Sequence, residues 1–367
     1  MEWSEKIQKA FFTLLRAGLW NRAVDDVSCF PLSASEWKNV WDHAVRQSVR
    51  GLIFDGVCLL PDSLMPDVQL VMVWTAAIDR VERRNRRMNQ VLLSVTKLLK
   101  EKGVIPLLLK GQGVAQLYEH PLLRECGDID LYFASRQDEQ LLLDWIQSKG
   151  IAIVKEADGA NAYVLDGIDI EHHLRIFDLY TPRVQRYLSH LLQNEGFRSL
   201  SLSTDAESSI CVLSPKLNLI SLNAHILKHL MGHGIGLRQF CDMARAYHVW
   251  HDTLDGEALK KCYQQCGLLR WSRLLHTLLV NELGLPVEEL PYKEKLSASS
   301  DYLLDRVIAE GNFGKYTAAR ADVAQPAWQR KLHTGMAFLK NLRFSLTYAP
   351  RETLGLVSDL FLGNIKS

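Results

Sequence analysis

The sequence predicts an α+β fold in which a small mixed β-sheet is flanked along the chain by two helical regions. Over residues 4–100 the apolar residues recur at intervals of three and four, which is typical of helices. The pattern then changes to short apolar runs bounded by glycines, which indicates buried strands. From residue 216 onward the helical spacing returns. We therefore expect a helical region at 1–100, an α/β core at 101–205 and a second helical region at 206–367.

The first region is expected to contain several helices separated by turns. Ile7, Phe11 and Leu14 share one helical face, and similar spacing continues to residue 100. Breaks are expected where prolines stand near Ser and Asp, at Pro31, Pro61 and Pro66.

The core is expected to combine short strands with two helices. The strands are expected at residues 104–109, 129–133, 151–155, 162–165 and 168–174. The helices are expected over residues 114–118 and 138–148. The dipeptide Asp166-Gly167 between the last two strands favours a tight hairpin. In the third region the helical spacing is clearest over residues 216–230, 268–283 and 328–342.

The composition is that of an ordinary folded protein. The 367 residues include 43 Lys and Arg against 42 Asp and Glu, giving a net charge of +1, and 47% are hydrophobic. These values exclude a disordered, collagen-like or coiled-coil chain. Because the net charge is so small, binding of nucleic acid or of another anion must depend on a local patch.

Three features favour a soluble, cytoplasmic protein. The seven cysteines are scattered without a C-x-x-C pair, which is typical of reduced thiols rather than of disulfides or a zinc ribbon. The N-terminal segment lacks the basic and then apolar order of a signal peptide. The longest nearly apolar run, residues 68–78, is too short to span a bilayer, so no membrane partner is expected.

Asp128 and Asp130 are the first candidate site residues. They stand two apart at an expected strand, so both carboxylates point to the same face. Two neighbouring carboxylates repel each other unless a cation lies between them. The pair therefore indicates either a divalent metal site, for Mg²⁺ or Mn²⁺, or a solvated strand end.

Residues around this pair could bind phosphate. Lys110, Gly111, Gln112 and Gly113 follow the first core strand, where glycines allow the backbone to approach a phosphate at the start of a helix. Arg124 stands just before the acidic strand and could neutralise a phosphate oxygen. The alternatives are that Lys110 simply ends the strand in solvent and that Arg124 forms a structural salt bridge.

A third carboxylate is expected from the later strand. Asp169, Glu171 and His173 alternate along it and share one face, so either acid could join the aspartate pair. Spacing alone leaves this choice open.

The order of these motifs resembles the DNA polymerase β-type nucleotidyltransferase superfamily. Closer still, LLLKGQGVAQLY, then Pro121, Arg124, GDIDLYF and IEHHL are similar to bacterial uncharacterised nucleotidyltransferases, which show LKG, R-x-x-x-D-x-D and E-x-H. The later segments AHILKHLMGHGIGLRQFCD and EGNFGK resemble further motifs of that family. The chain departs from the superfamily pattern at Gln112, where Gly or Ser is usual, and in the longer spacing from Gly111 to Asp128.

The resemblance implies transfer of a nucleoside monophosphate from an NTP to a hydroxyl group, with release of pyrophosphate. The acceptor can be a small molecule, a protein or a nucleic acid. Glu171 is favoured as the third acid because it matches the E-x-H position, and it would also help to deprotonate the acceptor. The implied metal ligands are Asp128, Asp130 and Glu171, and the implied nucleotide contacts are Lys110, Gly111, Gln112 and Arg124.

Two other functions are compatible with these residues. The chain could be a catalytically silent nucleotide-binding or toxin-neutralising module, although its intact acids count against this. It could also be a zinc hydrolase, because His225, His229 and His233 are spaced by four along a helix. Without an H-E-x-x-H pattern, a packing or substrate-contacting face is preferred.

Two charged groups have open interpretations. Arg238 and Asp242 stand four apart and either pair with each other or lie at the mouth of the site. A cluster of arginines is expected either to form a solvated helix face or to contact an anion such as a nucleic acid. Its members are Arg80, Arg83, Arg84, Arg86 and Arg87.

Overall fold

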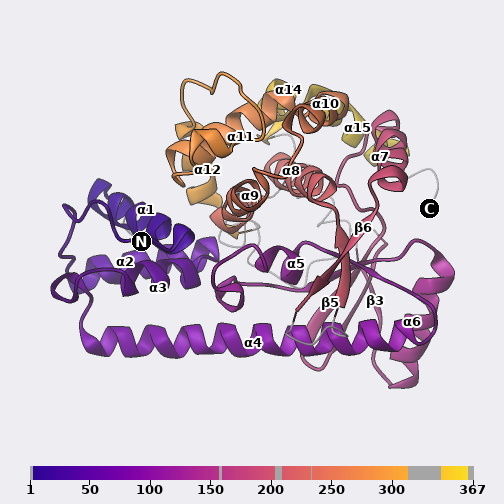
Figure 1. Cartoon of the computed structure of the whole chain (residues 1–367), viewed down its shortest axis with the longest axis horizontal. Coiled ribbons are helices and arrows are strands. Elements are labelled where there is room, and N and C mark those ends of the chain that lie inside the picture. Colours follow the sequence, from indigo (N-terminus) through magenta and orange to yellow (C-terminus); the bar gives the residue numbers. More distant parts are fainter. Residues whose placement is uncertain (1–2, 157–158, 203–208, 233, 313–339, 363–367) are drawn as a thin grey trace.

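A computed structural model confirms the α+β fold (Figure 1). It describes residues 3–156, 159–202, 209–232, 234–312 and 340–362. Among these residues, no helix is long and apolar enough to cross a membrane.

Residues 5–100 are mainly helical, as the apolar spacing predicts. Ser33 and Glu36 form a reciprocal capping box that starts the second helix, and Asp67 caps the long fourth helix. Pro31, Pro61 and Pro66 lie in breaks between helices, as expected, but the break between α2 and α3 at residues 48–49 contains no proline and was not predicted. The elements are α1 (Glu5–Trp20), α2 (Ala34–Gln47), α3 (Arg50–Cys58), η1 (Asp62–Leu64) and α4 (Val68–Lys100).

Seven strands in the described part of the chain form one mixed sheet, in the order β3-β4-β5-β2-β1-β7-β6. β2 pairs with β1 in antiparallel and with β5 in parallel orientation, and β1 also pairs in parallel with β7. The strands are β1 (Leu107–Leu109), β2 (Ile129–Tyr132), β3 (Val154–Lys155), β4 (Asn161–Leu165), β5 (Ile168–His173), β6 (Phe197–Ser201) and β7 (Ser209–Leu213).

The five expected strands are all present, and two more join them. β1 is shorter than the apolar run at 104–109, because Pro106 has no N–H to donate to a sheet. The sequence patterns did not reveal β6 and β7. The expected end of the core at residue 205 therefore falls between two strands of the sheet.

The Asp166-Gly167 hairpin is confirmed. Leu165 pairs with Ile168, and the two residues between them have positive φ angles of 53° and 76°, as a two-residue turn that follows the strand twist requires. This turn sets the register that places Glu171 and His173 on one face of β5.

Further helices and short 3₁₀ segments complete the fold. The expected helix at 114–118 instead begins at Gly111 and is only one turn long. Most of the expected helix at 328–342 lies outside the described residues. The elements are α5 (Gly111–Ala115), η2 (Pro121–Leu123), α6 (Arg136–Ser148), α7 (Pro182–Glu195), α8 (Pro215–Met231), α9 (Leu237–Trp250), α10 (Gly256–Cys266), α11 (Leu269–Asn281), η3 (Val287–Glu289), α12 (Asp301–Glu310), α14 (Leu342–Tyr348) and α15 (Pro350–Leu362).

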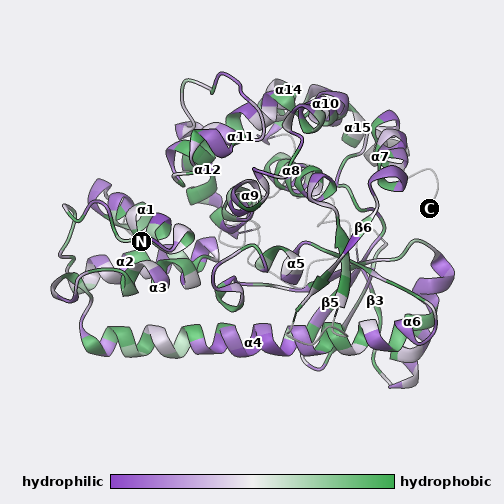
Figure 2. Ribbon diagram, viewed as in Figure 1, coloured by the Kyte–Doolittle hydropathy of each residue, from purple (hydrophilic) through white to green (hydrophobic). Residues whose placement is uncertain are grey.

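The two faces of the sheet pack into different cores. One core includes Leu108, Ile129 and Ile170 together with the second half of α4 and part of α6. Hydrophobic and hydrophilic residues alternate along α4 (Figure 2), as expected for a helix with one buried face. Leu107 and Leu109 point the other way, into the larger core that contains α8 and α9.

The two terminal helical regions share that larger core. Residues of α1 to α3 and of α8 to α12 belong to one continuous cluster of buried side chains. The indole Nε1 of Trp20 donates to the carbonyl oxygen of Leu283 at 2.6 Å, and Arg16 donates to that of Glu282 at 3.1 Å. The two terminal regions therefore pack directly against each other, and α8 and α9 lie over the face of the sheet that carries the acidic residues.

Candidate active site

The acidic residues meet at one cavity between the sheet and helices α8 and α9. Asp130 in β2 is the direct neighbour of Glu171 in β5, because the parallel register pairs these two positions. Asp128 lies two residues earlier on the same side. The cavity measures about 190 Å³, and its polar lining includes Lys110, Asp128, Asp130, Glu171, His173, His225, Lys228 and Arg238.

Asp130, Glu171 and His173 could hold a metal ion. Their ligand atoms all lie within 4.8 Å of one another. His173 Nε2 is 2.5 Å from Asp130 Oδ1 and 3.9 Å from Glu171 Oε1. Carboxylate oxygens suit Mg²⁺ and Mn²⁺, and an imidazole nitrogen is better tolerated by Mn²⁺. The donor set therefore fits the divalent cation that the resemblance implies.

The electrostatics of the carboxylates favour a cation. The negative charge of Asp130, followed by burial, raises the pKa of Asp128. Burial alone would raise the pKa of Asp130, but the charge of Lys110 and the hydrogen bond to His173 hold this pKa well below its usual range. Burial also raises the pKa of Glu171. Without a cation, ionised Asp128 and Glu171 are both disfavoured, and a divalent ion would remove that penalty.

Lys110 stands at the turn from β1 into α5 in a conformation that is rare outside glycine. Its φ and ψ angles are 49° and −134°, and Gly111 after it also has a positive φ of 41°. Such backbone strain costs about 1–3 kcal/mol and is concentrated at functional sites. The turn places Lys110 Nζ 3.7 Å from Asp130 Oδ2, inside the cavity.

The other two expected nucleotide contacts, Gln112 and Arg124, are bonded to other side chains of the protein. Gln112 is buried and is not part of the cavity lining, and its side chain donates to Asn85 Oδ1 at 3.2 Å. Arg124 does line the cavity, but it forms a buried bidentate pair with Asp242, with both N–O distances at 2.7 Å. Tyr118 donates to the same carboxylate. Arg124 is thus the partner of Asp242, rather than the Arg238 that its spacing suggested.

This buried pair yields a stability prediction. We expect Asp242→Ala to lower the free energy of unfolding by about 3–5 kcal/mol, because it leaves the Arg124 guanidinium buried and unpaired. Urea denaturation measures the change. As a control, Asp79→Ala breaks the exposed pair with Arg83 and should cost at most about 1 kcal/mol. Equal losses of unfolding free energy in the two variants would show that the buried pair stabilises the fold no more than an exposed pair does.

Asp169 lies outside the cavity lining and pairs with the arginine cluster. Arg84 Nη2 is 3.3 Å from Asp169 Oδ2, and the same atom donates to the carbonyl oxygen of Gly127 at 2.7 Å. Arg87 pairs with Asp166 at 3.3 Å. The cluster thus contacts the hairpin and the loop before β2 from outside, and Arg83 and Arg86 pair with acids of α4 itself.

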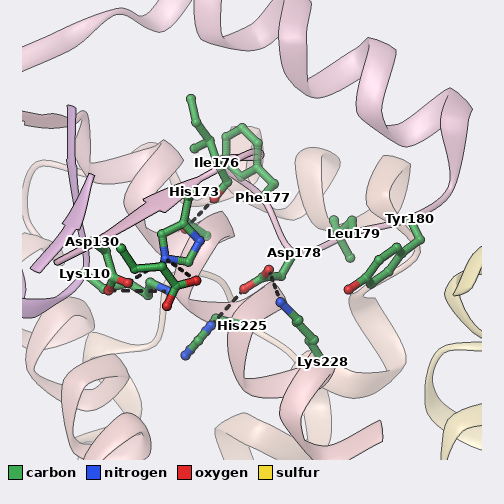
Figure 3. A network of polar contacts seen from close by, with 12 residues as sticks. Lys110, Asp130, His173, Ile176, Phe177, Asp178, Leu179, Tyr180, His225 and Lys228 are labelled. Atoms are coloured by element: carbon green, nitrogen blue, oxygen red, sulfur yellow. Dashed lines mark hydrogen bonds and ion pairs between the residues drawn. The ribbon is translucent and has the colours of Figure 1, made fainter. Parts of the chain in front are cut away.

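Two residues of the histidine stripe on α8, His225 and His229, line the same cavity as the carboxylates, and Figure 3 shows His225 beside Asp178. His225 Nδ1 is 2.8 Å from Asp178 Oδ2, and Lys228 Nζ is 2.7 Å from the other oxygen of that carboxylate. The His229 ring packs edge-on against His225 at 4.4 Å. His233 lies outside the described residues, and none of the described stripe residues belongs to the possible metal group.

Sequence reasoning assigned no role in the site to three residues, although it placed His173 on the same face as Glu171. His173 belongs to the E-x-H motif, which was a usable signal for its place beside Asp130. Asp178 follows β5 at a position that no periodicity marks. Lys228 carried no signal beyond its place near the stripe, and only the packing of α8 over the sheet brings it to the cavity.

The chain is similar to a protein family and to a solved structure. Residues 33–283 match a family model described as uncharacterised nucleotidyltransferase. A crystal structure of an antigenic nucleotidyltransferase-like protein from Paracoccidioides brasiliensis matches with 13% identity and a TM-score of 0.32, over 54% of this chain and 92% of that one. No curated protein shows significant similarity to the chain.

Proposed function

The chain belongs to the family of uncharacterised nucleotidyltransferases, and from this premise we propose that it transfers a nucleoside monophosphate from an NTP to the hydroxyl group of an acceptor, releasing pyrophosphate. One observation carries the proposal: Asp128, Asp130 and Glu171 converge with Lys110 on a single cavity. A cavity that pairs clustered carboxylates with a lysine can hold a divalent cation beside a triphosphate.

Asp128, Asp130 and Glu171 would hold Mg²⁺ or Mn²⁺. When bound, the ion supplies positive charge that offsets the triphosphate and stabilises the entering and leaving oxygens of an in-line displacement. The 4.8 Å grouping contains Asp130, Glu171 and His173 but not Asp128, so it supports the assignment of Asp130 and Glu171. Asp128 lines the same cavity, where the charge of Asp130 raises its pKa and a cation would relieve that repulsion.

Lys110 would bind a phosphate oxygen as a point charge. Its strained backbone holds the ammonium group at the cavity, and Gly111 beside it leaves room for a phosphate near the main chain. The surroundings of Gln112 and Arg124 support a different use: Gln112 anchors α5 to Asn85 of α4, and Arg124 anchors the loop before β2 to Asp242 of α9.

Labelling of an acceptor tests the proposal. The full chain is incubated with each α-³²P-labelled NTP, Mg²⁺ or Mn²⁺, and a cell extract. We expect at least one NTP to label an extract component, and EDTA to prevent it. Metal-dependent NTP binding without labelled product would instead favour the catalytically silent module, and absence of both would contradict the proposal.

A further inference from the structure

We propose that His225 is the general base that removes the proton from the acceptor hydroxyl, and that Asp178 is its positioning residue. The inference rests on the proposed function and assigns a step of that same reaction. His225, on α8, lines the same cavity as the carboxylates (Figure 3).

The contact with Asp178 determines which nitrogen of His225 can act. The ring is held through Nδ1, 2.8 Å from a carboxylate oxygen of Asp178, and both side chains are largely buried. Because a carboxylate accepts a hydrogen bond, Nδ1 carries the proton and Nε2 keeps its lone pair. Figure 3 shows this second nitrogen on the far side of the ring from Asp178. No hydrogen bond joins it to another described residue.

The other histidines near the sheet cannot serve in the same way. His173 Nε2 already forms a hydrogen bond with Asp130. His172 points to the opposite face of β5, where Glu139 and Tyr163 engage its two nitrogens at 3.0 and 3.1 Å. Glu171 is the other candidate base, but a carboxylate that holds a divalent cation is a weaker proton acceptor.

Burial and the charges around His225 keep its ring in the neutral form. Burial, together with the positive charge of Lys110, lowers the pKa of His225 to about 4, so the ring is neutral near pH 7. Asp178 raises the pKa of His225, whereas Lys228 lowers it. The other titratable neighbours are His229 and Asp130. A triphosphate bound at Lys110 would offset its charge and raise the pKa of His225, which makes the ring a stronger base once the nucleotide is bound.

The proposed step conserves atoms and charge. The acceptor oxygen forms a bond to the α-phosphorus while the bond from that phosphorus to the bridging oxygen breaks, and pyrophosphate leaves with the electron pair. The hydroxyl proton moves to His225 Nε2. The resulting imidazolium is stabilised by Asp178 and then returns its proton to solvent.

The test compares His225→Gln and His225→Ala with the wild-type chain. The readouts are labelling of the extract component from α-³²P-NTP and the rise in melting temperature caused by Mn²⁺ plus NTP. We expect labelling to fall about 100-fold while the temperature shift is kept. Added imidazole should restore part of the rate of His225→Ala. Asp178→Asn should lower the rate and shift its pH profile, because the ring loses its anionic partner.

His248 provides a matched control, because its Nδ1 is also 2.8 Å from a carboxylate, that of Glu289, outside the cavity. His248→Gln should leave labelling unchanged. The proposal is overturned if His225→Gln labels at the wild-type rate, if it loses the temperature shift, or if imidazole rescues nothing in a folded His225→Ala. His225→Asn replaces either variant that fails to fold. Failure of the wild-type chain to label any component would instead overturn the proposed function itself.

Discussion

Replacing Asp128 and Asp130 together by asparagine is expected to abolish transfer and to remove the rise in melting temperature that Mn²⁺ and an NTP produce together. A ligand that binds only the native state stabilises it by mass action, so loss of the metal site removes the shift. Metal-derived stabilisation of the transition state amounts to several kcal/mol, which corresponds to a rate loss of roughly 1,000-fold or more.

The free energy of unfolding of each single variant, measured without metal, distinguishes metal binding by these aspartates from a contribution to folding stability. The pKa of Asp128 is raised in the folded protein, so its charged form is disfavoured there and Asp128→Asn should not destabilise the chain. The pKa of Asp130 is lowered, so Asp130→Asn should destabilise it. A double variant with exposed Asp144 and Asp252 changed to asparagine serves as the control. An intact metal-dependent shift in the Asp128 and Asp130 variant would refute the metal assignment.

Glu171→Gln is expected to lower the transfer rate by about 100-fold or more while largely sparing NTP affinity, whereas Asp169→Asn should stay within about twofold of wild type. Glu171 lines the cavity beside Asp130, and Asp169 pairs with Arg84 outside the lining. With Asp128 and Asp130 still present to hold the ion, loss of the Glu171 ligand should affect the transition state more than ground-state nucleotide binding. An exposed ion pair contributes at most about 1 kcal/mol.

The two variants form a matched comparison, because the residues lie two positions apart on one face of β5. Nucleotide affinity from the melting temperature shift and the labelling rate are measured for both. An inactive Asp169→Asn beside an active Glu171→Gln would transfer the role to Asp169. If Glu171→Gln lost NTP binding in the same proportion as rate, Glu171 would be a ground-state ligand instead.

Local patterns in the sequence were sufficient to predict many of the secondary-structure elements and the position of the acidic residues on one face. Period and turn chemistry are properties of a few consecutive residues. The helical character of the first region, the hairpin at Asp166-Gly167 and the shared face of Asp128 and Asp130 could therefore be predicted, whereas the break between α2 and α3 could not. The motifs around Lys110, Asp128 and Glu171 also carried the resemblance to the family that the family model confirms.

Contacts between distant segments depended on the tertiary structure. Spacing within a helix suggested Arg238 for Asp242, but packing of α9 against the loop before β2 placed Arg124 there, 118 positions away in the chain. Packing of α8 over the sheet likewise brought His225 and Lys228 to the carboxylates, and the terminal helical regions merged into one core. Such pairings follow from how whole elements bury their apolar faces against one another, and periodicity within one element carries no information about which distant face it will meet.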